Sequence, residues 1–141
     1  MTTPMELIEF YWKVIWNERA TERLGEVFHE PYVHNRSEAT LAEHAEIVAE
    51  TVRAIPDLRI EIVDITEAGA AVITRTRFAG RHGGDLFGVG PTGRALIAPS
   101  LDVYFFRDGR VERLWHLFDH LPLLREMGAV ATVDGRPADL E

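Results

Sequence analysis

The chain has 141 residues, of which 46% are hydrophobic and 27% are charged, and its formal net charge is −8. This length predicts one domain over residues 1–141, with enough chain to bury a core. The acidic balance excludes nucleic acid and an anionic membrane surface as main partners, because both would require a basic patch.

The sequence contains no cysteine, which excludes disulfides, thiolate catalysis and cysteine-bound zinc. This absence fits a reducing compartment, so we expect a cytoplasmic protein. The N-terminal segment lacks the basic region of a signal peptide. No uncharged apolar run of 18 residues occurs, so no membrane span is predicted.

The first predicted element is a helix that begins at Thr3 and Pro4. A capping residue followed by proline in the first turn is a typical start signal. The apolar stripe of this helix is widened by Ile8, Trp12 and Trp16 and exceeds the roughly 100° of an ordinary amphipathic face. We therefore expect a sheet, or the mouth of a cavity, to cover this helix.

Two more helices are predicted in the first half of the chain, over residues 21–28 and from Ser37 or Thr40 to Ile55. Between them, residues 29–39 predict a short strand that leads into a loop. His34 lies at this point. Its side chain either points into a pocket or bonds a loop carbonyl group.

From residue 58 the apolar period changes to two, which predicts strands over residues 58–66, 70–80, 95–107 and 110–118. An Asp108-Gly109 turn joins the last two strands as a tight hairpin. A loop with five glycines, residues 81–94, precedes them, and loops of this length are often functional. The order predicts an α+β domain in which helices pack on one face of a curved, mainly antiparallel sheet.

The last strand leads into a short helix over residues 121–127, and Asp119 lies at the junction. Alternation places Trp115, Leu117 and Asp119 on one face of this strand, and Leu114, His116 and Phe118 on the other. A carboxylate among apolar side chains is a candidate general acid/base. The alternative is that Asp119 caps the helix that follows.

The remaining polar residues do not indicate a metal site or a nucleophilic serine. The histidines lack a shared face or a metal-ligand spacing, so no metal site is predicted, and Ser100 is not in a nucleophile elbow. Acid/base chemistry remains, with candidates Asp119, Asp102, His34, His82 and His116, and with Arg75 and Arg77 as electrostatic partners. For Asp102, within a strand, a salt bridge to an arginine of the neighbouring strand is the simpler interpretation.

Three linked segments resemble the SnoaL-like polyketide cyclases (ester cyclases) of the NTF2-like superfamily. They are FAGRHGGDLFGVGPTGR (78–94), LDVYFFRDGRVERLW (101–115), and Asp119 with the leucine-rich LPLLREMG that follows. The resemblance implies a cone-shaped α+β barrel whose sheet and N-terminal helices enclose a hydrophobic pocket. It also implies an intramolecular aldol ring closure that needs no cofactor, with Asp119 as general acid/base.

The resemblance places His34 in the pocket as a polar partner of Asp119. Further substrate-binding residues are expected to be Trp115, Trp12, Trp16, Phe87, Arg75, His82 and Asp102. The expected substrate is a small hydrophobic or aromatic molecule, held in a pocket that the loop at 81–94 gates.

Two alternatives stay open on the same scaffold. The first is an epoxide hydrolase or dehydratase in which Asp102 and Asp119 work as a pair, with Arg75 or Arg77 between them. The second is a non-catalytic small-molecule-binding or interaction domain. For either, a sheet face rich in Val, Ile and Phe would be a large apolar patch on a monomer, so a homodimer or higher homo-oligomer is expected.

Overall fold

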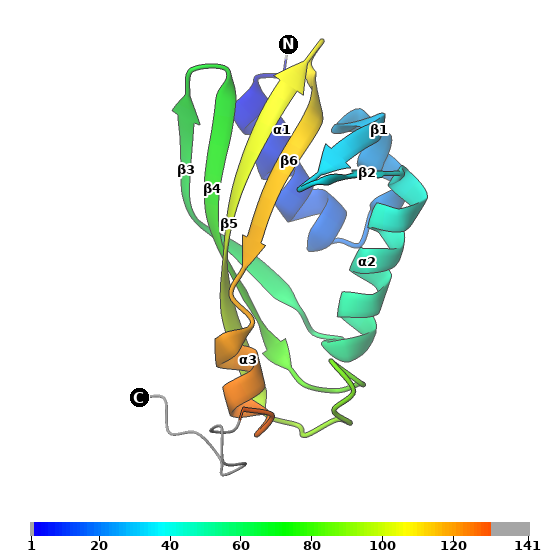
Figure 1. Ribbon diagram of the computed structural model, residues 1–141, viewed down its shortest axis with the longest axis vertical. Helices are drawn as coiled ribbons and strands as arrows, with labels where there is room; N and C mark the ends of the chain where they lie inside the picture. Colours follow the sequence, from blue (N-terminus) through cyan, green and yellow to red (C-terminus); the bar gives the residue numbers. More distant parts are fainter. Residues whose placement is uncertain (1, 131–141) are drawn as a thin grey trace.

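Helices from the first half of the chain pack against a curved, six-stranded sheet in the computed structural model of the protein (Figure 1). The structure describes residues 2–130. The strands follow the order β2-β1-β6-β5-β4-β3, so β2 and β3 are edges and the sheet does not close. This arrangement confirms the predicted α+β class with N-terminal helices on a curved sheet.

The first predicted helix consists of α1 (Pro4–Phe10) and a π-helical turn, η1 (Tyr11–Trp16). The Thr3 hydroxyl caps α1 and accepts a hydrogen bond from the Glu6 N–H at 3.1 Å. The wider π-helical turn places Tyr11, Trp12 and Trp16 in the core together, which a regular helix would spread over a broader arc. A 3-10 helix, η2 (Thr21–Glu26), follows.

The segment predicted as one short strand forms a hairpin instead. Strand β1 (Phe28–His34) pairs with β2 (Ser37–Ala39) antiparallel and with β6 parallel. These two strands extend the predicted four-stranded meander to a six-stranded sheet. Helix α2 (Leu41–Ala54) then begins at Thr40, which forms a capping box with Glu43.

The predicted four-stranded meander is confirmed as β3 (Arg59–Ala68), β4 (Ala71–Arg81), β5 (Ala95–Arg107) and β6 (Arg110–Phe118), followed by α3 (Leu121–Glu126). The β5–β6 register shifts by one residue near the hairpin. Phe106 lies opposite Val111, whereas Phe105 lies opposite Arg113, so Glu112 is an extra residue in β6. The rest of β6 is therefore paired one residue later than a regular hairpin would place it.

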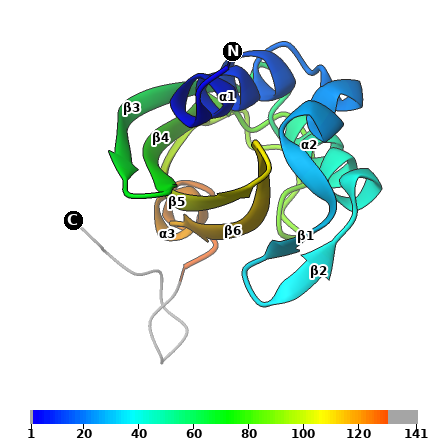
Figure 2. The ribbon, with the colours of Figure 1, turned by 90° about the horizontal axis from the view of Figure 1, so that it is seen from above.

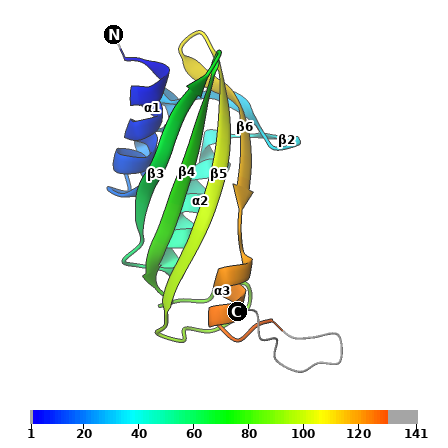
Figure 3. The ribbon, with the colours of Figure 1, turned by 90° about the vertical axis from the view of Figure 1, so that its left-hand side faces the viewer.

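The sheet curls toward α1 and α2, which lie on its concave side (Figure 2). The core fills the space between them. Figure 3 shows the opposite, convex face of β3–β6, which α1 and α2 do not cover. The predicted exposed apolar face lies there, and on β5 and β6 it consists of Ile97, Leu101, Phe105 and Leu117, together with Trp115, which was predicted to face the pocket. The homodimer expected from this face stays a prediction.

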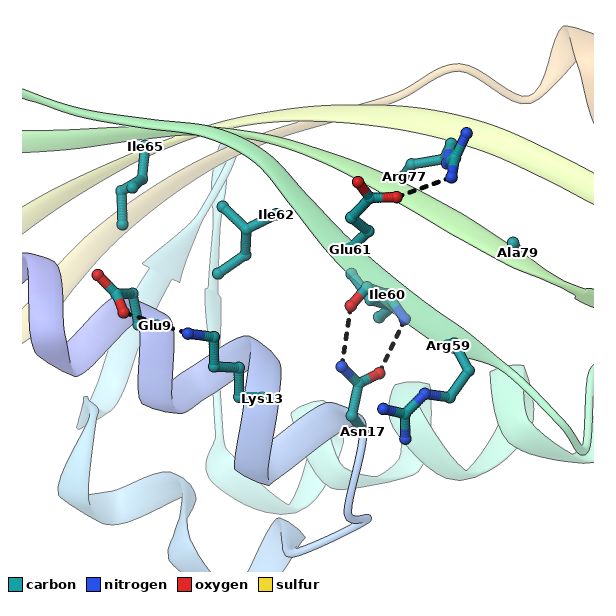
Figure 4. Close-up of a pocket in the computed structure, with 10 residues that line it drawn as sticks. All are labelled: Glu9, Lys13, Asn17, Arg59, Ile60, Glu61, Ile62, Ile65, Arg77 and Ala79. Atoms are coloured by element: carbon teal, nitrogen blue, oxygen red, sulfur yellow. Dashed lines mark hydrogen bonds and ion pairs between the residues drawn. The ribbon is translucent and has the colours of Figure 1, made fainter.

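The free edge of β3 is occupied by a side chain from the end of η1 (Figure 4). The Asn17 amide donates to the Ile60 carbonyl oxygen and accepts from the Ile60 N–H, both at 2.8 Å. A groove of about 660 Å³ runs along this edge. Its side chains include two ion pairs, Lys13–Glu9 at 3.3 Å and Arg77–Glu61 at 2.7 Å.

Candidate active site

A cavity of about 900 Å³ lies between the concave face of the sheet, η1, α2 and the loop after β4. Aromatic and aliphatic side chains line it together, and the indoles of Trp12 and Trp16 stack with ring centres 6.0 Å apart. Phe87 lines it from the loop, as do Asp85 and Leu86. Trp12, Trp16 and Phe87, which were predicted as walls of the pocket, all line this cavity.

A histidine–carboxylate pair beside the cavity links β6 to β5. Asp102 lies directly opposite His116 in the β5–β6 register, and the His116 Nδ1–H donates to Asp102 Oδ1 at 2.6 Å. Since the carboxylate can only accept, this bond fixes the tautomer and leaves Nε2 as the lone-pair nitrogen. His116 lines the cavity and Nε2 has no partner among the described residues, so His116 has the arrangement of a general base.

Asp102 is held as a buried carboxylate by three donors. Its side chain is 1% exposed, and it accepts hydrogen bonds from His116, from the Ser100 hydroxyl and from the Tyr104 hydroxyl, the last two at 3.0 Å. Burial of a carboxylate is costly unless it is bonded in this way. Since alternate residues of a strand share a face, Ser100, Asp102 and Tyr104 all point inward from β5.

His34 lies beside this pair at the end of β1. Its ring centre is 5.8 Å from that of His116, and both residues line the cavity. Burial lowers the pKa of His34, and the neighbouring His116 lowers it further. The next residue, Asn35, accepts a hydrogen bond from the His116 backbone N–H at 2.7 Å. The structure thus brings His34, predicted as a polar partner, to His116.

A third histidine, His44 of α2, completes the polar cluster. It is 3% exposed, and its ring nitrogens bond the hydroxyl groups of Tyr11 and Tyr32. Burial lowers its pKa to about 3, so His44 is neutral near pH 7. His44 was not predicted as a site residue, because it occupies an ordinary position on the inner face of a helix. Nothing in its local sequence marks it as a site residue.

The depressed pKa of His44 predicts a loss of stability in acid. The unfolded chain binds this proton near pH 6.5 and the folded chain only near pH 3, so stability falls as the pH is lowered through that window. Between pH 7 and pH 5, His44 should remove about 2 kcal/mol from the free energy of unfolding. Urea denaturation at both pH values should show a smaller loss for His44→Gln, which can still bond both hydroxyls. An equal loss in His44→Gln would contradict this, and His29→Gln on β1 is the control.

Asp119 lies outside the cavity wall. It is exposed, and its carboxylate accepts a hydrogen bond from the N–H of Leu121, the first residue of α3, at 3.1 Å. The N-cap position of α3 belongs to His120, so Asp119 contacts the start of this helix from one residue before the cap. The role of Asp119 as general acid/base stays a prediction, and the geometry favours His116 for that role.

Two other predicted site residues face away from the cavity. Trp115 is on the convex face and 40% exposed, because the extra residue Glu112 turns Leu114 and His116 inward. Arg75 also points outward and pairs with Asp64 on β3. These positions correct the predicted cavity contacts of Trp115 and Arg75. Arg77 points outward as well and pairs with Glu61, so neither arginine lies between Asp102 and Asp119, as the paired-carboxylate alternative requires.

His82 and Asp102, both predicted to contact the substrate, do not line the cavity either. His82 is fully buried at the base of the loop, where its Nδ1 lies 2.9 Å from the Thr92 hydroxyl. Asp102 was interpreted as a partner of an arginine on a neighbouring strand. That interpretation is wrong, because Thr74 is opposite Asp102 on β4 and the flanking arginine faces the other way.

The described residues contain neither a metal-binding cluster nor a membrane-spanning helix. Between residues 2 and 130, no group of three or more His, Asp or Glu side chains is arranged to hold a metal ion. Within the same range, no helix has the length and apolar character needed to cross a membrane.

A curved sheet with helices over its concave side, and a polar histidine cluster inside an aromatic cavity, defines a cavity-bearing α+β protein of the NTF2-like class. The model of the SnoaL-like polyketide cyclase family matches residues 6–127. The chain belongs to this family, as the sequence motifs predicted. A comparison with functionally curated proteins gives no match.

Solved structures show the same fold at low identity. AclR from Streptomyces galilaeus and TsrD from Streptomyces laurentii are both 24% identical to the chain, with a TM-score of 0.81. The AclR match covers 90% of this chain and 96% of AclR, and the TsrD match covers 89% and 94%. A SnoaL-like polyketide cyclase from Agrobacterium tumefaciens is 21% identical, with a TM-score of 0.79, and the match covers 91% of this chain and all of that one.

Proposed function

We propose that the protein is a cyclase-like enzyme that closes a carbon ring by acid/base catalysis, with His116 as the general base. The observation that supports this most strongly is the 2.6 Å hydrogen bond to the buried Asp102 from His116, which lies on the wall of the cavity. Membership of the SnoaL-like polyketide cyclase family supports the reaction class.

The reaction that fits this pair is an intramolecular aldol closure. His116 Nε2 takes a hydrogen from a carbon beside a carbonyl group, and the electron pair of that C–H bond forms an enolate. The enolate carbon then bonds to a second carbonyl carbon of the same molecule, whose oxygen becomes an alkoxide. His116 returns the proton to this alkoxide. No atom is gained or lost, so the product is an isomer of the substrate, and the step needs no cofactor.

The cavity supports a small hydrophobic or aromatic substrate. Its aromatic walls favour flat apolar rings, and a cavity of about 900 Å³ admits a molecule of several fused rings. The charged lining residues Glu50, Arg53 and Asp85 come from α2 and the loop after β4. They lie on other elements than the His116–Asp102 pair. The inner wall therefore offers few charges and would select substrates by shape and carbonyl groups.

A non-catalytic binding protein is the second candidate, and the position of Asp119 favours it. The bond from Asp119 to the Leu121 N–H gives this carboxylate a structural role at α3. If Asp119 were the only residue that could act as a general acid/base, this structural role would leave the cavity with a binding function alone. The two candidates therefore differ in whether His116 moves a proton.

Exchange of hydrogen for deuterium in a simple ketone tests the proposed function without knowledge of the natural substrate. 2-Tetralone is a bicyclic aromatic ketone with acidic α-hydrogens, and NMR in D₂O follows their loss. We expect the protein to accelerate this exchange well above buffer and above heat-denatured protein. The Asp119→Asn variant should retain the acceleration. If the native protein binds the ketone without accelerating exchange, the binding-protein candidate is correct; if Asp119→Asn abolishes exchange, the base is Asp119.

A further inference from the structure

A buried chain of three polar side chains runs from β1 through α2 to the cavity. The Tyr32 hydroxyl lies 2.7 Å from His44 Nδ1, and the Tyr11 hydroxyl lies 2.8 Å from His44 Nε2. All three residues are at most 3% exposed. Tyr11 and His44 line the cavity, whereas Tyr32 does not. The chain thus has an inner end at Tyr32 and a cavity end at Tyr11.

The chemistry of a neutral imidazole determines the direction of these two bonds. Neutral His44 has one N–H and one lone pair, so it donates to one tyrosine and accepts from the other. If Nε2 carries the hydrogen, Tyr32 donates to Nδ1 and His44 donates to the Tyr11 oxygen. The hydroxyl hydrogen of Tyr11 is then free for another acceptor. If Nδ1 carries the hydrogen, Tyr11 must donate its hydroxyl hydrogen to His44 Nε2 and cannot donate it to another acceptor.

The cavity end of this chain lies close to the His116–Asp102 pair. Successive ring centres are 5.5 Å apart from Tyr11 to His44, 6.3 Å from His44 to His34 and 5.8 Å from His34 to His116. Tyr11 is also 6.2 Å, ring to ring, from Tyr104, which bonds Asp102. Tyr11 and His116 line the same cavity and are linked through these neighbouring rings, so one substrate can contact both.

The surroundings of Tyr11 contain two buried indole donors. Its neighbours Trp12 and Trp16 line the cavity, and the indole N–H of Trp12 is buried without a partner among the described residues. Burial raises the pKa of Tyr11, whereas the Trp16 side chain beside its hydroxyl lowers that pKa. Buried donors without partners are costly, so such groups often mark a place where a ligand supplies the acceptor. An oxygen atom of the substrate would supply an acceptor to the Trp12 indole N–H.

We propose that Tyr11 is a catalytic residue that donates a hydrogen bond to the substrate oxygen on which negative charge develops, and that His44 and Tyr32 are positioning residues. The inference rests on the proposed acid/base function. It names the substrate group as a ketone or ester oxygen beside the carbon that His116 deprotonates. Binding of this oxygen selects the Nε2–H tautomer of His44, so that Tyr32, His44 and Tyr11 all donate toward the cavity. Tyr11 keeps its proton, since only a hydrogen bond forms.

A phenolate probe tests the donor directly, because its oxygen has the charge of an enolate. Binding of 4-nitrophenolate is measured by its absorption spectrum, at a pH where the free probe is ionised. We expect Tyr11→Phe to weaken binding about 10–100-fold, as for loss of a hydrogen bond to a charged group. Tyr32→Phe should also weaken binding, although Tyr32 does not line the cavity, because Tyr11 can then donate to His44 instead. Thr76→Val, which removes a buried hydroxyl without a partner, should leave the affinity within about twofold.

The tautomer of His44 is a second readout that a merely structural role would not move. In ¹⁵N-histidine NMR spectra of the native protein, addition of 4-nitrophenolate should raise the population that carries hydrogen on Nε2. An unchanged tautomer with bound probe, or Tyr11→Phe affinity within twofold of native, would overturn the proposal. If Tyr11→Phe does not fold, Tyr32→Phe and the native spectra still decide the question. These binding measurements require no turnover. A negative result here would therefore not bear on His116 as the general base, and the hydrogen bond from Tyr11 can still be tested if the protein does not exchange the ketone hydrogens.

Discussion

Replacement of His116 by glutamine is expected to lower the rate of deuterium exchange into 2-tetralone by about 10²–10⁴-fold, the usual contribution of a general base. Glutamine keeps the approximate size and polarity of the side chain and can still donate to Asp102. It cannot take a proton near neutral pH. The affinity for the ketone, measured by NMR titration, should change little, because the aromatic walls of the cavity remain.

A companion variant, Asp102→Asn, separates the two members of the pair. The amide can donate to Nδ1 of His116, which favours the wrong tautomer and places a hydrogen on Nε2, toward the cavity. We expect a loss of exchange rate comparable to that of His116→Gln, with both variants folded. Rates near native in His116→Gln would exclude His116 as the base, and Asp119 would become the first residue to test.

Replacement of Gly84 by alanine is expected to destabilise the fold by about 2–3 kcal/mol, as for other overpacked sites. A Cβ atom at Gly84 would lie 2.3 Å from the backbone oxygen of Arg53, and backbone cannot swing away as a side chain can. Here the loop touches the end of α2: the N–H groups of Gly83 and Gly84 both donate to the Ala54 carbonyl, at 2.9 and 3.1 Å. Chemical denaturation measures the change.

Gly90 provides a matched control in the same loop. A Cβ atom there would meet nothing within 4 Å, so Gly90→Ala should change stability by less than about 0.5 kcal/mol. Because Asp85, Leu86 and Phe87 line the cavity just beyond Gly84, the Gly84 variant should also bind ketone more weakly at temperatures where it remains folded. Equal stability of the two variants would show that the loop accommodates the displacement.

The parts of the fold that follow from local sequence could be predicted. In these parts, the spacing of apolar residues and the capping or turn residues at the ends indicate the same structure. They are the capped helix at Thr3, the helix that ends before Pro56, and the four long strands with their Asp108-Gly109 turn. The hairpin of β1 and β2 could not be predicted as easily. Both strands are short, and β1 pairs with β6, which lies about 80 residues later in the chain.

The site depended on one residue that local patterns do not reveal. A regular ladder from the Asp108-Gly109 turn would place Trp115 opposite Asp102 and would turn Asp119 to the same inner face. The bulge at Glu112 shifts β6 by one residue, so His116 meets Asp102 and Trp115 faces outward. The choice between Asp119 and His116 therefore depends on a tertiary detail. The family motifs around residues 101–119 identify the fold without fixing this register.

The histidine between two tyrosines was beyond prediction for a different reason. Tyr11, Tyr32 and His44 come from three elements, and each is unremarkable within its own pattern. Only the packing of η1, β1 and α2 brings their polar atoms within 3 Å of one another. Trp12 and Trp16 could be predicted, because the excess of aromatic surface on one helix already required a cavity or a sheet to cover it.

The side chain of Asn17 at the edge of β3 has a consequence for the behaviour of the protein at high concentration. A free sheet edge is a template on which a strand of another molecule can pair, the first step toward fibrous aggregation. The Asn17 amide uses both the N–H and the carbonyl group of Ile60, and the Arg19 guanidinium donates to the Leu58 carbonyl at 2.8 Å. The first residues of this edge therefore cannot accept an incoming strand, and the open sheet is protected there without being closed.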